Sequence, residues 1–509
     1  MTAPEFAFRT PGAHPDDPCR THQRALMGHV RKFRMSGTSR RTMRTVLAGR
    51  RKWLTAGALG VALVAAAPVA IAAQGNQDDQ GARTASAGSG DRTQEIRQAI
   101  QGGHARNVIL FIGDGMGQSE ITSARNYERG AAGRLAMDEF PLTGDYTTYA
   151  VEKGNPAKPD YVTDSAASGT GWATGTKTYN GAISVDAYGN PVPTLLELAK
   201  RSGLRTGDVT TAEVQDATPA VLGAHVVDRD CKGPDETTRK CARNAKENGG
   251  AGSISEQLVQ TRPDVLLGGG AKYFAQLATA GQFKGKPVLE QAKAAGYTVV
   301  DTADDLAKAQ PGKPLLGLFA PGNLPVNWTG PKATQGGTAP ARCTANPVLP
   351  KTQPKLLAQT QKALQLLDDR RSTKGFFLQV EGASIDKQDH AADPCGQIGE
   401  TIDFDAAVAA GLAYARSHPD TLVVVTADHG HTSQIVSNDA KTPGQTATLI
   451  TNEGANMTLN YGTALPGSSM EHTGTQVRIA AYGPQAANVV GLTNQTDLFG
   501  TVKRALRLR

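Results

Sequence analysis

The 509-residue sequence has little cysteine, no internal repeat, and no apolar run beyond residue 73 that is long enough to span a bilayer. Its five cysteines never show the CxxC spacing that is usual for a four-thiolate zinc site. With 57 glycines and 39% apolar residues, the composition excludes both a collagen-like chain and a wholly disordered one. The length therefore predicts a globular protein of one to three domains with a large hydrophobic core.

The excess of positive charge is confined to the start of the sequence. The formal net charge is +7, but residues 1–73 hold 12 of the 54 Lys and Arg residues and only three of the 47 Asp and Glu residues. The remaining 42 basic and 44 acidic residues give a net charge of about −2. The composition therefore predicts no nucleic-acid-binding role.

Residues 1–73 have the pattern of a leader with a signal peptide. The run Leu54–Ala73 is rich in Ala, Val and Leu, follows Arg50-Arg51-Lys52 and ends in small residues. An uncleaved membrane anchor is the alternative, and Ser39-Arg40-Arg41-Thr42-Met43 resembles a twin-arginine signal, so the export route stays open. Residues 74–104 are predicted to be a flexible linker. We expect an exported protein, periplasmic or extracellular, without a stable membrane span after cleavage.

Four cysteines remain once the leader, with Cys19, is set aside. An even number of cysteines fits an oxidising compartment, and four cysteines allow three pairings. Proximity in sequence favours two local disulfides, Cys231 with Cys241 and Cys343 with Cys395. Each is expected to stabilise the fold by roughly 2 to 4 kcal/mol, because it constrains the unfolded chain.

Short β-branched runs alternate with helical patterns after the linker. This alternation predicts an α/β fold with a doubly wound, mostly parallel sheet. The Gly/Pro-rich stretch Pro321–Pro354 is expected to be a surface insertion closed by the second cysteine pair. The predicted strands are Asn107–Gly113, Thr206–Thr211, Asp264–Leu267, Gly375–Glu381, Leu422–Ala427 and Val477–Tyr482, and the helices include Thr194–Ser202, Ala358–Asp368 and Thr401–Ser417.

Candidate ligands stand where four of these strands end. Open α/β sheets bind ligands outside the carboxyl ends of their strands, so we expect these side chains to meet. They are Asp114 after the first strand, Asp216 and Thr218 after the second, Glu381 after the fourth, and Asp428 with His429 after the fifth.

Two further segments contain imidazoles. Asp386 and His390 stand four residues apart, which puts a carboxylate and an imidazole on one helix face, although a capped helix start explains the same pattern. His472 lies in Met470–Gly474, and together the motifs predict a two-metal site. His225 and His431 are interpreted as structural or supporting residues.

Asp164-Ser165 precedes a helical pattern and has two interpretations. Asp and Ser are favoured N-cap residues, so an ordinary cap explains them. A serine at a helix N-terminus is also well placed beside a phosphate, and an adjacent metal lowers the pKa of its hydroxyl. Ser165 is therefore a candidate nucleophile.

Read together, these motifs resemble the bacterial alkaline phosphatase family from about Asn107 to Arg509. The resemblance implies a three-layer alkaline-phosphatase-like fold and assigns residues 105–509 to one catalytic domain. Gly169, Gly171 and Gly430 stand where the family often has Ala, and the loop near Pro331–Pro354 is poorly matched. The matching segments are Asn107–Gly117, Val162–Ser168, Gln215–Pro219, Gln379–His390, Thr426–His429 and Glu471–Gly474.

The resemblance implies two Zn²⁺ and one Mg²⁺ per subunit. One zinc would be held by Asp386, His390 and His472, and the second by Asp114, Asp428, His429 and the Ser165 oxygen. Magnesium would lie near Asp114, Thr218 and Glu381, with Asp216 acting through water. Arg229 would clamp the phosphate with its planar fork, and Lys387 would assist through water.

The implied activity is that of a phosphoric monoester hydrolase. Phosphate monoesters would be cleaved by in-line displacement through a phosphoseryl intermediate, with release of inorganic phosphate. A homodimer is expected from the family alone. A sulfatase is disfavoured because Ala167 and Gly169 stand where it needs Pro and Arg. A phosphodiesterase of the same superfamily and an exported phosphate-binding protein remain alternatives.

Overall fold

The computed structural model describes residues 91–368 and 374–509. The predicted leader and most of the predicted linker lie outside these residues. The described end of the linker contains helix α1, Thr93–Ala99, which has no buried residue. Within the described residues, no helix is both long and apolar enough to cross a membrane.

A ten-stranded sheet forms the centre of the described residues, in the order β18-β2-β17-β13-β1-β12-β5-β6-β8-β7. Neighbours from β13 to β7 pair in parallel, whereas β17 is antiparallel to both β13 and β2. The prediction of a mostly parallel sheet is therefore confirmed. The strands are β1 (Asn107–Gly113), β2 (Leu142–Thr147), β5 (Arg205–Glu213), β6 (Val265–Gly269), β7 (Thr298–Val300), β8 (Leu315–Leu318), β12 (Phe376–Gly382), β13 (Thr421–Ala427), β17 (Val477–Tyr482) and β18 (Gly491–Asn494).

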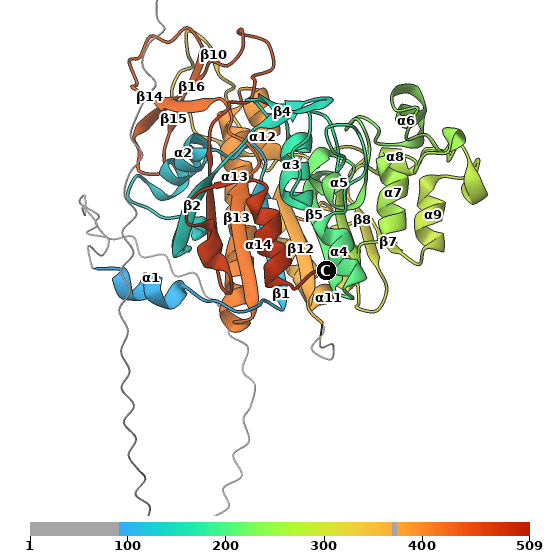
Figure 1. The fold of residues 1–509 in the computed structure, drawn as a ribbon. Coiled ribbons are helices and arrows are strands. Elements are labelled where there is room, and N and C mark those ends of the chain that lie inside the picture. The colour runs from blue at the N-terminus through green and yellow to red at the C-terminus, as the bar shows by residue number, and fades with distance from the viewer. Residues whose placement is uncertain (1–90, 369–373) are drawn as a thin grey trace, which may run out of the picture. The chain divides into compact units, whose positions relative to one another are not determined.

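Helices cover the sheet on both faces, which makes three layers (Figure 1). In the view of Figure 1, one group packs in front of the sheet and a second group lies behind it. The front group is α3 (Ser165–Thr174), α4 (Leu195–Arg201), α5 (Ala217–Gly223) and α14 (Asp497–Ala505), followed by α7 (Ile254–Thr261) and α9 (Val288–Ala294). The second group includes α2 (Gln118–Arg129), α11 (Leu356–Leu367), α12 (Ser384–His390) and α13 (Pro394–Ser417).

The predicted elements occur; Asn107–Gly113 and Val477–Tyr482 keep their predicted ends, and the ends of the others shift. The strand predicted at Thr206–Thr211 extends to Glu213 as β5. The helix predicted from Thr401 begins seven residues earlier, at Pro394, because Asp393 caps it by accepting a hydrogen bond from Gly396 N. Proline suits this first turn because it has no N–H to leave unpaired.

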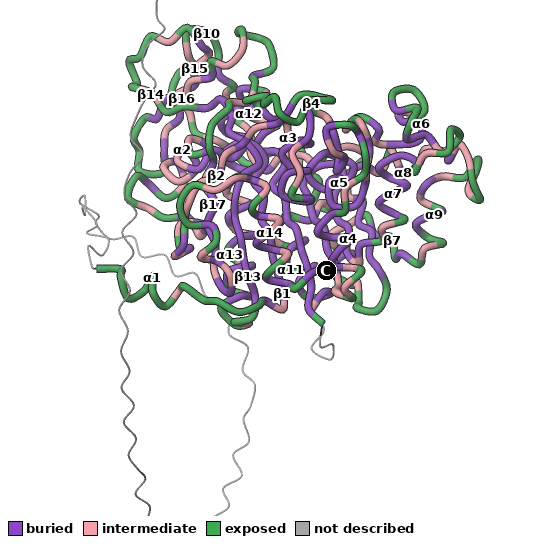
Figure 2. The backbone as a smooth tube through the Cα atoms, viewed as in Figure 1, coloured by how far each residue is buried: buried purple, intermediate pink, exposed green. Residues whose placement is uncertain are grey.

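The core lies in the sheet and the inner faces of the helices, where the backbone is buried in Figure 2. All seven residues of each of β1, β12 and β13 are buried. A strand covered on both faces needs a continuous apolar run, as in Val108–Ile112, and not an alternating pattern. The polar groups that follow these strands are thereby held by rigid, buried backbone.

Smaller elements surround the central sheet. A four-stranded sheet, β10-β15-β16-β14, packs against α2 through β14. The predicted insertion Pro321–Pro354 contains only short strands, and Cys343 within it is joined to Cys395. The other predicted pair, Cys231 and Cys241, is also joined. The remaining elements are β3 (Ala150–Glu152), β4 (Asn155–Asp160), β9 (Trp328–Thr329), β10 (Thr334–Gln335), β11 (Thr344–Ala345), β14 (Ser433–Val436), β15 (Gln445–Ile450), β16 (Asn456–Tyr461), α6 (Pro234–Lys240), α8 (Ala271–Phe274) and α10 (Ala303–Lys308).

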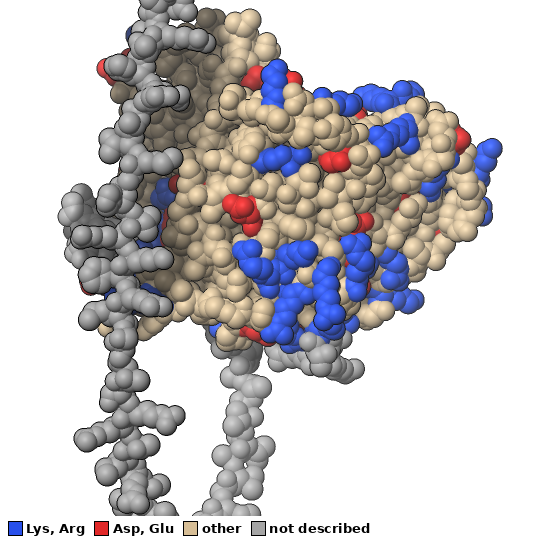
Figure 3. All heavy atoms as spheres, in the orientation of Figure 1, with Lys and Arg blue, Asp and Glu red and all other residues tan. Residues whose placement is uncertain are grey.

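A basic hollow of about 900 Å³ lies at the amino ends of the parallel strands, lined by Arg106, Arg201, Lys374 and Arg507 among others. In Figure 3, Lys and Arg side chains gather over the lower ends of α4 and α14. This is the edge of the sheet opposite the predicted site. Its lining contains none of the residues predicted from the strand ends, so we do not assign it to the active site.

Candidate active site

The sheet register brings the predicted strand-end residues to one edge. In β1, Ile112 pairs with Glu381 of β12, and Gly113 pairs with Ala427 of β13. Asp114 and Asp428, which follow these two strands, are therefore neighbours. Asp428 Oδ1 accepts a hydrogen bond from Gly115 N at 2.8 Å, and Gly115 has a φ of +66° that favours glycine.

Backbone pairing carries the third imidazole segment to the same place. Gly430, next to His429, forms an antiparallel bridge with Thr473, next to His472. Met470 N donates to His390 O at 3.0 Å, which fixes the segment against α12. The rings of His429 and His472 consequently stack at 3.6 Å between centroids. Two motifs separated by more than forty residues in the sequence thus share one site.

Asp386, His390 and His472 converge on one point. His390 Nε2 and His472 Nε2 lie 3.2 Å apart, and Asp386 Oδ1 lies 3.4 Å and 3.2 Å from them. Zinc with bonds of about 2.0 Å in a tetrahedron separates its ligand atoms by about 3.3 Å. The three atoms are therefore already at the spacing of a tetrahedral zinc site.

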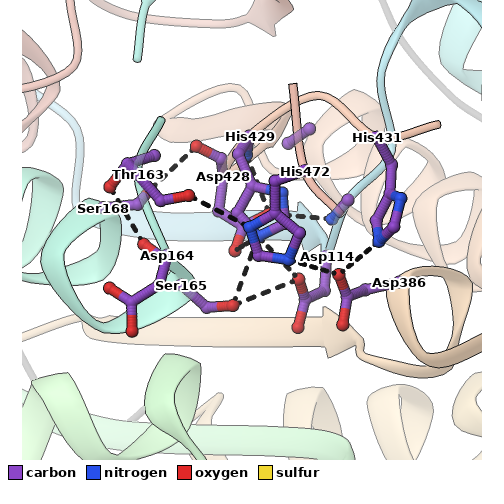
Figure 4. A network of polar contacts seen from close by, with 12 residues as sticks. Asp114, Thr163, Asp164, Ser165, Ser168, Asp386, Asp428, His429, His431 and His472 are labelled. Carbon is purple, nitrogen blue, oxygen red and sulfur yellow. Dashed lines mark hydrogen bonds and ion pairs between the residues drawn. The ribbon is translucent and has the colours of Figure 1, made fainter. Parts of the chain in front are cut away.

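Ser165, Asp114, Asp428 and His429 form a second cluster (Figure 4). His429 Nε2 lies 3.3 Å from Ser165 Oγ, 3.4 Å from Asp114 Oδ1 and 3.3 Å from Asp428 Oδ2. Asp386 also stands close enough to Asp114 and His429 for all three to hold one ion. The two clusters are therefore adjacent, and Ser165 belongs to the second.

The hydrogen bonds of the histidines define which ring nitrogens are free to bind a metal. The Nδ1 atoms of His472 and His390 face the backbone carbonyls of Thr163 and Met470, and that of His429 faces Gly430 O at 3.3 Å. A carbonyl only accepts, so each Nδ1 carries the proton and each Nε2 presents its lone pair. All three lone pairs are directed into the clusters.

His431 also approaches the first cluster, with its Nε2 3.1 Å from Asp386 Oδ1. Its tautomer differs, because its Nδ1 accepts a hydrogen bond from Thr432 N at 2.9 Å. The proton therefore sits on Nε2, which can donate to Asp386 but cannot bind a metal. Although His431 lies within reach of the same ion, this geometry agrees with the supporting role predicted from the sequence.

The buried carboxylates destabilise one another without a counter-ion. Burial, together with repulsion from Asp386 and Asp428, raises the pKa of Asp114 well above its usual range. Burial raises the pKa of Asp428 to about 6 and that of Glu381 to about 7. The buried Asp428 Oδ2 has no hydrogen-bond partner, and Asp386 Oδ1 faces only histidine ring nitrogens. A divalent cation would relieve the repulsion and would give Asp428 Oδ2 a partner.

Glu381 and Thr218, the other two oxygen donors predicted for magnesium beside Asp114, are buried. Glu381 accepts a hydrogen bond from the Thr210 hydroxyl, and the buried Thr218 hydroxyl has no partner. Asp216 is the N-cap residue of α5. Its Oδ2 lies 2.9 Å from Lys387 Nζ, and this carboxylate raises the pKa of Lys387 although burial opposes the charge. Asp216 is thus engaged by cations of the protein itself.

Arg229 is held beside Ser165 by two carboxylates. Its Nη1 lies 3.1 Å from Asp164 Oδ2 and its Nη2 lies 3.3 Å from Asp216 Oδ1. Asp164 also caps α3 by accepting a hydrogen bond from Ala167 N at 2.9 Å. The cap interpretation of Asp164 is therefore right, and the same residue orients the predicted phosphate clamp.

Sequence reasoning missed two residues that contact this site. Thr210 donates to Glu381 from within a buried strand, where its hydroxyl gave no signal. Lys232 lies 3.3 Å from Asp216 Oδ1. Its position three residues after Arg229 could have indicated a place near the site. A lysine in a loop closed by a disulfide is, however, usually interpreted as a surface residue.

Comparison with known proteins agrees with this geometry. A sequence model described as "Alkaline phosphatase" matches residues 105–464 and 441–508. The chain is 58% identical over 428 residues to the alkaline phosphatase of Escherichia fergusonii, covering 83% of this chain and 90% of that protein. It is also 58% identical over 413 residues to a streptomycin-6-phosphate phosphatase of Streptomyces griseus, covering 80% and 91%. The solved alkaline phosphatase from the Antarctic bacterium TAB5 superposes with a TM-score of 0.60 at 26% identity, covering 80% of this chain and 100% of that one.

The fold and the site define an α/β protein with a centre able to bind metals. The chain belongs to the alkaline phosphatase family, and it is a phosphoric monoester hydrolase. The family resemblance and the fold predicted from the sequence are confirmed.

Proposed function

We propose that this chain is an exported alkaline phosphatase that hydrolyses phosphate monoesters through a phosphoserine formed on Ser165. The observation that carries the proposal is the position of Ser165 Oγ. It stands at the first residue of α3, 3.3 Å from His429 Nε2 and 3.5 Å from Asp114 Oδ1, with Arg229 tied to the preceding residue. The candidate nucleophile Ser165 thus lies between a cluster able to bind a metal and Arg229, the predicted phosphate clamp.

The donor sets suit two zinc ions and one magnesium ion. Asp386, His390 and His472 would hold one zinc, and Asp114, Asp428 and His429, with the Ser165 oxygen, would hold the other. The free Nε2 lone pairs and the partnerless Asp428 Oδ2 support this assignment. Asp114, Thr218 and Glu381 offer only oxygen, which suits magnesium, with Asp216 acting through water. When bound, these cations lower the pKa of the serine hydroxyl and neutralise charge on the leaving oxygen.

The residues of the chain perform the remaining tasks. The N-terminus of α3 directs N–H groups and the positive end of its dipole at the phosphate. Arg229 presents two N–H groups to two phosphate oxygens. The Ser165 hydroxyl releases its proton to water as Oγ forms a bond to phosphorus and the bond to the ester oxygen breaks, and the ester oxygen takes a proton from water. A water molecule then attacks phosphorus, Ser165 Oγ leaves and regains a proton, and inorganic phosphate is released. Lys387, paired with Asp216, would assist through water.

The decisive experiment follows release of nitrophenol from nitrophenyl phosphate by the metal-loaded protein. Ser165→Ala and treatment with a chelator should each abolish release, and zinc with magnesium should restore it only in the wild type. Ser202→Ala, at the end of α4, is the matched control and should retain activity. Mass spectrometry of protein quenched in acid with excess phosphate should find one phosphoryl group on Ser165. Equal rates for wild type and Ser165→Ala would refute the serine mechanism.

The same assay separates the two alternatives. A rate on bis-nitrophenyl phosphate far above that on the monoester would assign the chain as a phosphodiesterase. Phosphate binding without any release of nitrophenol would assign it as an exported phosphate-binding protein. The buried Ser165 within reach of a metal-capable cluster favours turnover, since a binder needs no activated nucleophile.

Export and dimerisation belong to the same proposal. The leader pattern in residues 1–73 and the two joined cysteine pairs support an oxidising destination. Fractionation of cells that express the full chain should place the shortened product outside the cytoplasm, and retention in the inner membrane would indicate an uncleaved anchor. Sedimentation of the exported product should give the mass of a homodimer.

A further inference from the structure

Lys232 is a partly buried cation that the proposed mechanism does not use. It lies in the loop between Cys231 and Cys241, and its carbonyl accepts hydrogen bonds from Ser255 N at 3.0 Å and from Ser255 Oγ at 2.8 Å. Cys231, the residue before it, is joined to Cys241. The backbone that carries Lys232 is therefore fixed, and its side chain, only 17% exposed, extends inward.

The ammonium group of Lys232 shares one oxygen atom with the phosphate clamp. Lys232 Nζ lies 3.3 Å from Asp216 Oδ1, and Arg229 Nη2 lies 3.3 Å from the same Oδ1. Lys387 occupies the other oxygen of Asp216. Glu213 anchors Lys232 from the opposite side at 2.7 Å. Asp216 therefore links the Lys232 ammonium group directly to the guanidinium group of Arg229.

This sharing has a definite electrostatic direction. Lys232 and Arg229 both interact with Oδ1 of Asp216. Asp216 therefore attracts Arg229 less strongly than it would without Lys232. Lys232 also offsets the negative charge of Asp216, which would otherwise repel an incoming phosphate. Loss of the lysine charge would draw Arg229 toward Asp216 and leave the Asp216 carboxylate with one cation fewer near the phosphate. Both effects weaken phosphate binding.

We propose that Lys232 is a positioning residue that adjusts phosphate affinity by neutralising Asp216 and leaving the Arg229 guanidinium free to bind the anion. This inference rests on the proposed phosphate site at Arg229. It does not require Lys232 to touch the substrate, and it predicts an effect on phosphate affinity that exceeds any effect on the chemical step.

The contacts allow a closely matched set of variants. Lys232→Met removes the charge and keeps most of the apolar stem, and Lys232→Arg restores a cation. Lys272→Met is the control, because Lys272 Nζ pairs with the other oxygen of Glu213, at 2.6 Å, and is half exposed. A unit charge about 10 Å from a phosphate, at an effective dielectric constant of about 20, changes affinity on the order of tenfold.

The experiment measures the inhibition constant of inorganic phosphate together with kcat and KM for nitrophenyl phosphate. Lys232→Met should raise the inhibition constant and KM by about tenfold, with a smaller change in kcat. Lys232→Arg should recover most of the loss, and Lys272→Met should shift the constant by less than about twofold. An unchanged inhibition constant in Lys232→Met, or an equal change in Lys272→Met, would overturn the proposal.

Calorimetric titration of inorganic phosphate into metal-loaded proteins carrying Ser165→Ala separates this inference from the proposed function. Lys232→Met in that background should again bind phosphate about tenfold more weakly. If the wild type binds phosphate but turns nothing over, the proposed function fails, while the Lys232 effect on binding still supports the inference. If turnover is normal and phosphate binding in Lys232→Met equals that of its parent, the inference fails alone. If Lys232→Met unfolds, phosphate binding is measured on Glu213→Gln instead. That variant keeps Lys232 and should retain phosphate affinity, and a tenfold loss there would overturn the proposal.

Discussion

Substitution of His431 tests whether this residue is a metal ligand or a hydrogen-bond donor to one. Its ring is buried, its Nδ1 accepts from Thr432 N, and its Nε2 faces Asp386 Oδ1 at 3.1 Å. His431→Phe keeps an aromatic ring of similar size, and it removes both the Nε2 donor to Asp386 and the Nδ1 acceptor of Thr432 N. Loss of a donor that orients a ligand typically costs 10 to 100-fold in metal affinity, or about 1.4 to 2.7 kcal/mol.

The assay is competition for zinc between the protein and a coloured chelator. His472→Phe, which removes a proposed ligand, should cost more than about 100-fold. His225→Phe is the control, because His225 is partly buried, lies 3.0 Å from Glu197 and takes no part in either cluster. At saturating zinc, His431→Phe should regain most of its activity. A loss of zinc affinity equal to that of His472→Phe would make His431 a ligand and refute the tautomer argument. A loss below about threefold would show that His431 does not help Asp386 to bind zinc.

Three further predictions concern stability. Asp164→Ala removes the cap of α3 and should lower the free energy of unfolding, measured in urea, by about 1 kcal/mol. Asp164→Asn should keep most of the stability that the cap contributes, and equal losses in the two variants would argue against the cap. Replacing Cys343 and Cys395 by Ser opens a loop of 52 residues and should cost roughly 4 kcal/mol in the same measurement, and an unchanged free energy of unfolding would contradict this. Burial raises the pKa of Glu400 to about 7 from 4.5, so the ionised folded state is penalised as pH rises through this range. Glu400→Gln should therefore gain up to about 3 kcal/mol relative to wild type between pH 4.5 and 8, and a constant difference would contradict the shift.

Sequence reasoning succeeded where a local pattern has one structural meaning. Val108–Ile112 is apolar throughout, and only a strand buried on both faces needs such a run at this length. Parallel strands end at the same edge of a sheet. The sequence therefore predicted that the residues at four strand ends lie together, and these include Asp114, Asp216, Glu381 and Asp428. Neither step requires knowledge of the packing of distant side chains.

The sequence did not predict contacts that depend on tertiary packing. The small sheet containing β14, β15 and β16 pairs residues through turns and registers that no periodicity specifies. Lys232 and Thr210 acquire their roles only when β5, β12 and the Cys231 loop are brought together. The spacing of Arg229 from Lys232 does not reveal that both side chains reach one oxygen of Asp216.

The glycines at family alanine positions illustrate the same limit and have a physical reason. A Cβ on Gly169 would lie 2.9 Å from Val221 Cγ1, because α3 and α5 approach closely there, and a Cβ on Gly430 would lie 2.4 Å from Thr475 Cγ2. Gly430 forms the bridge that brings His472 to His429. Alanine at either position therefore requires a compensating change in the facing side chain. Glycine at these two positions thus lets the backbone near Ser165 and His472 pass close to Val221 and Thr475.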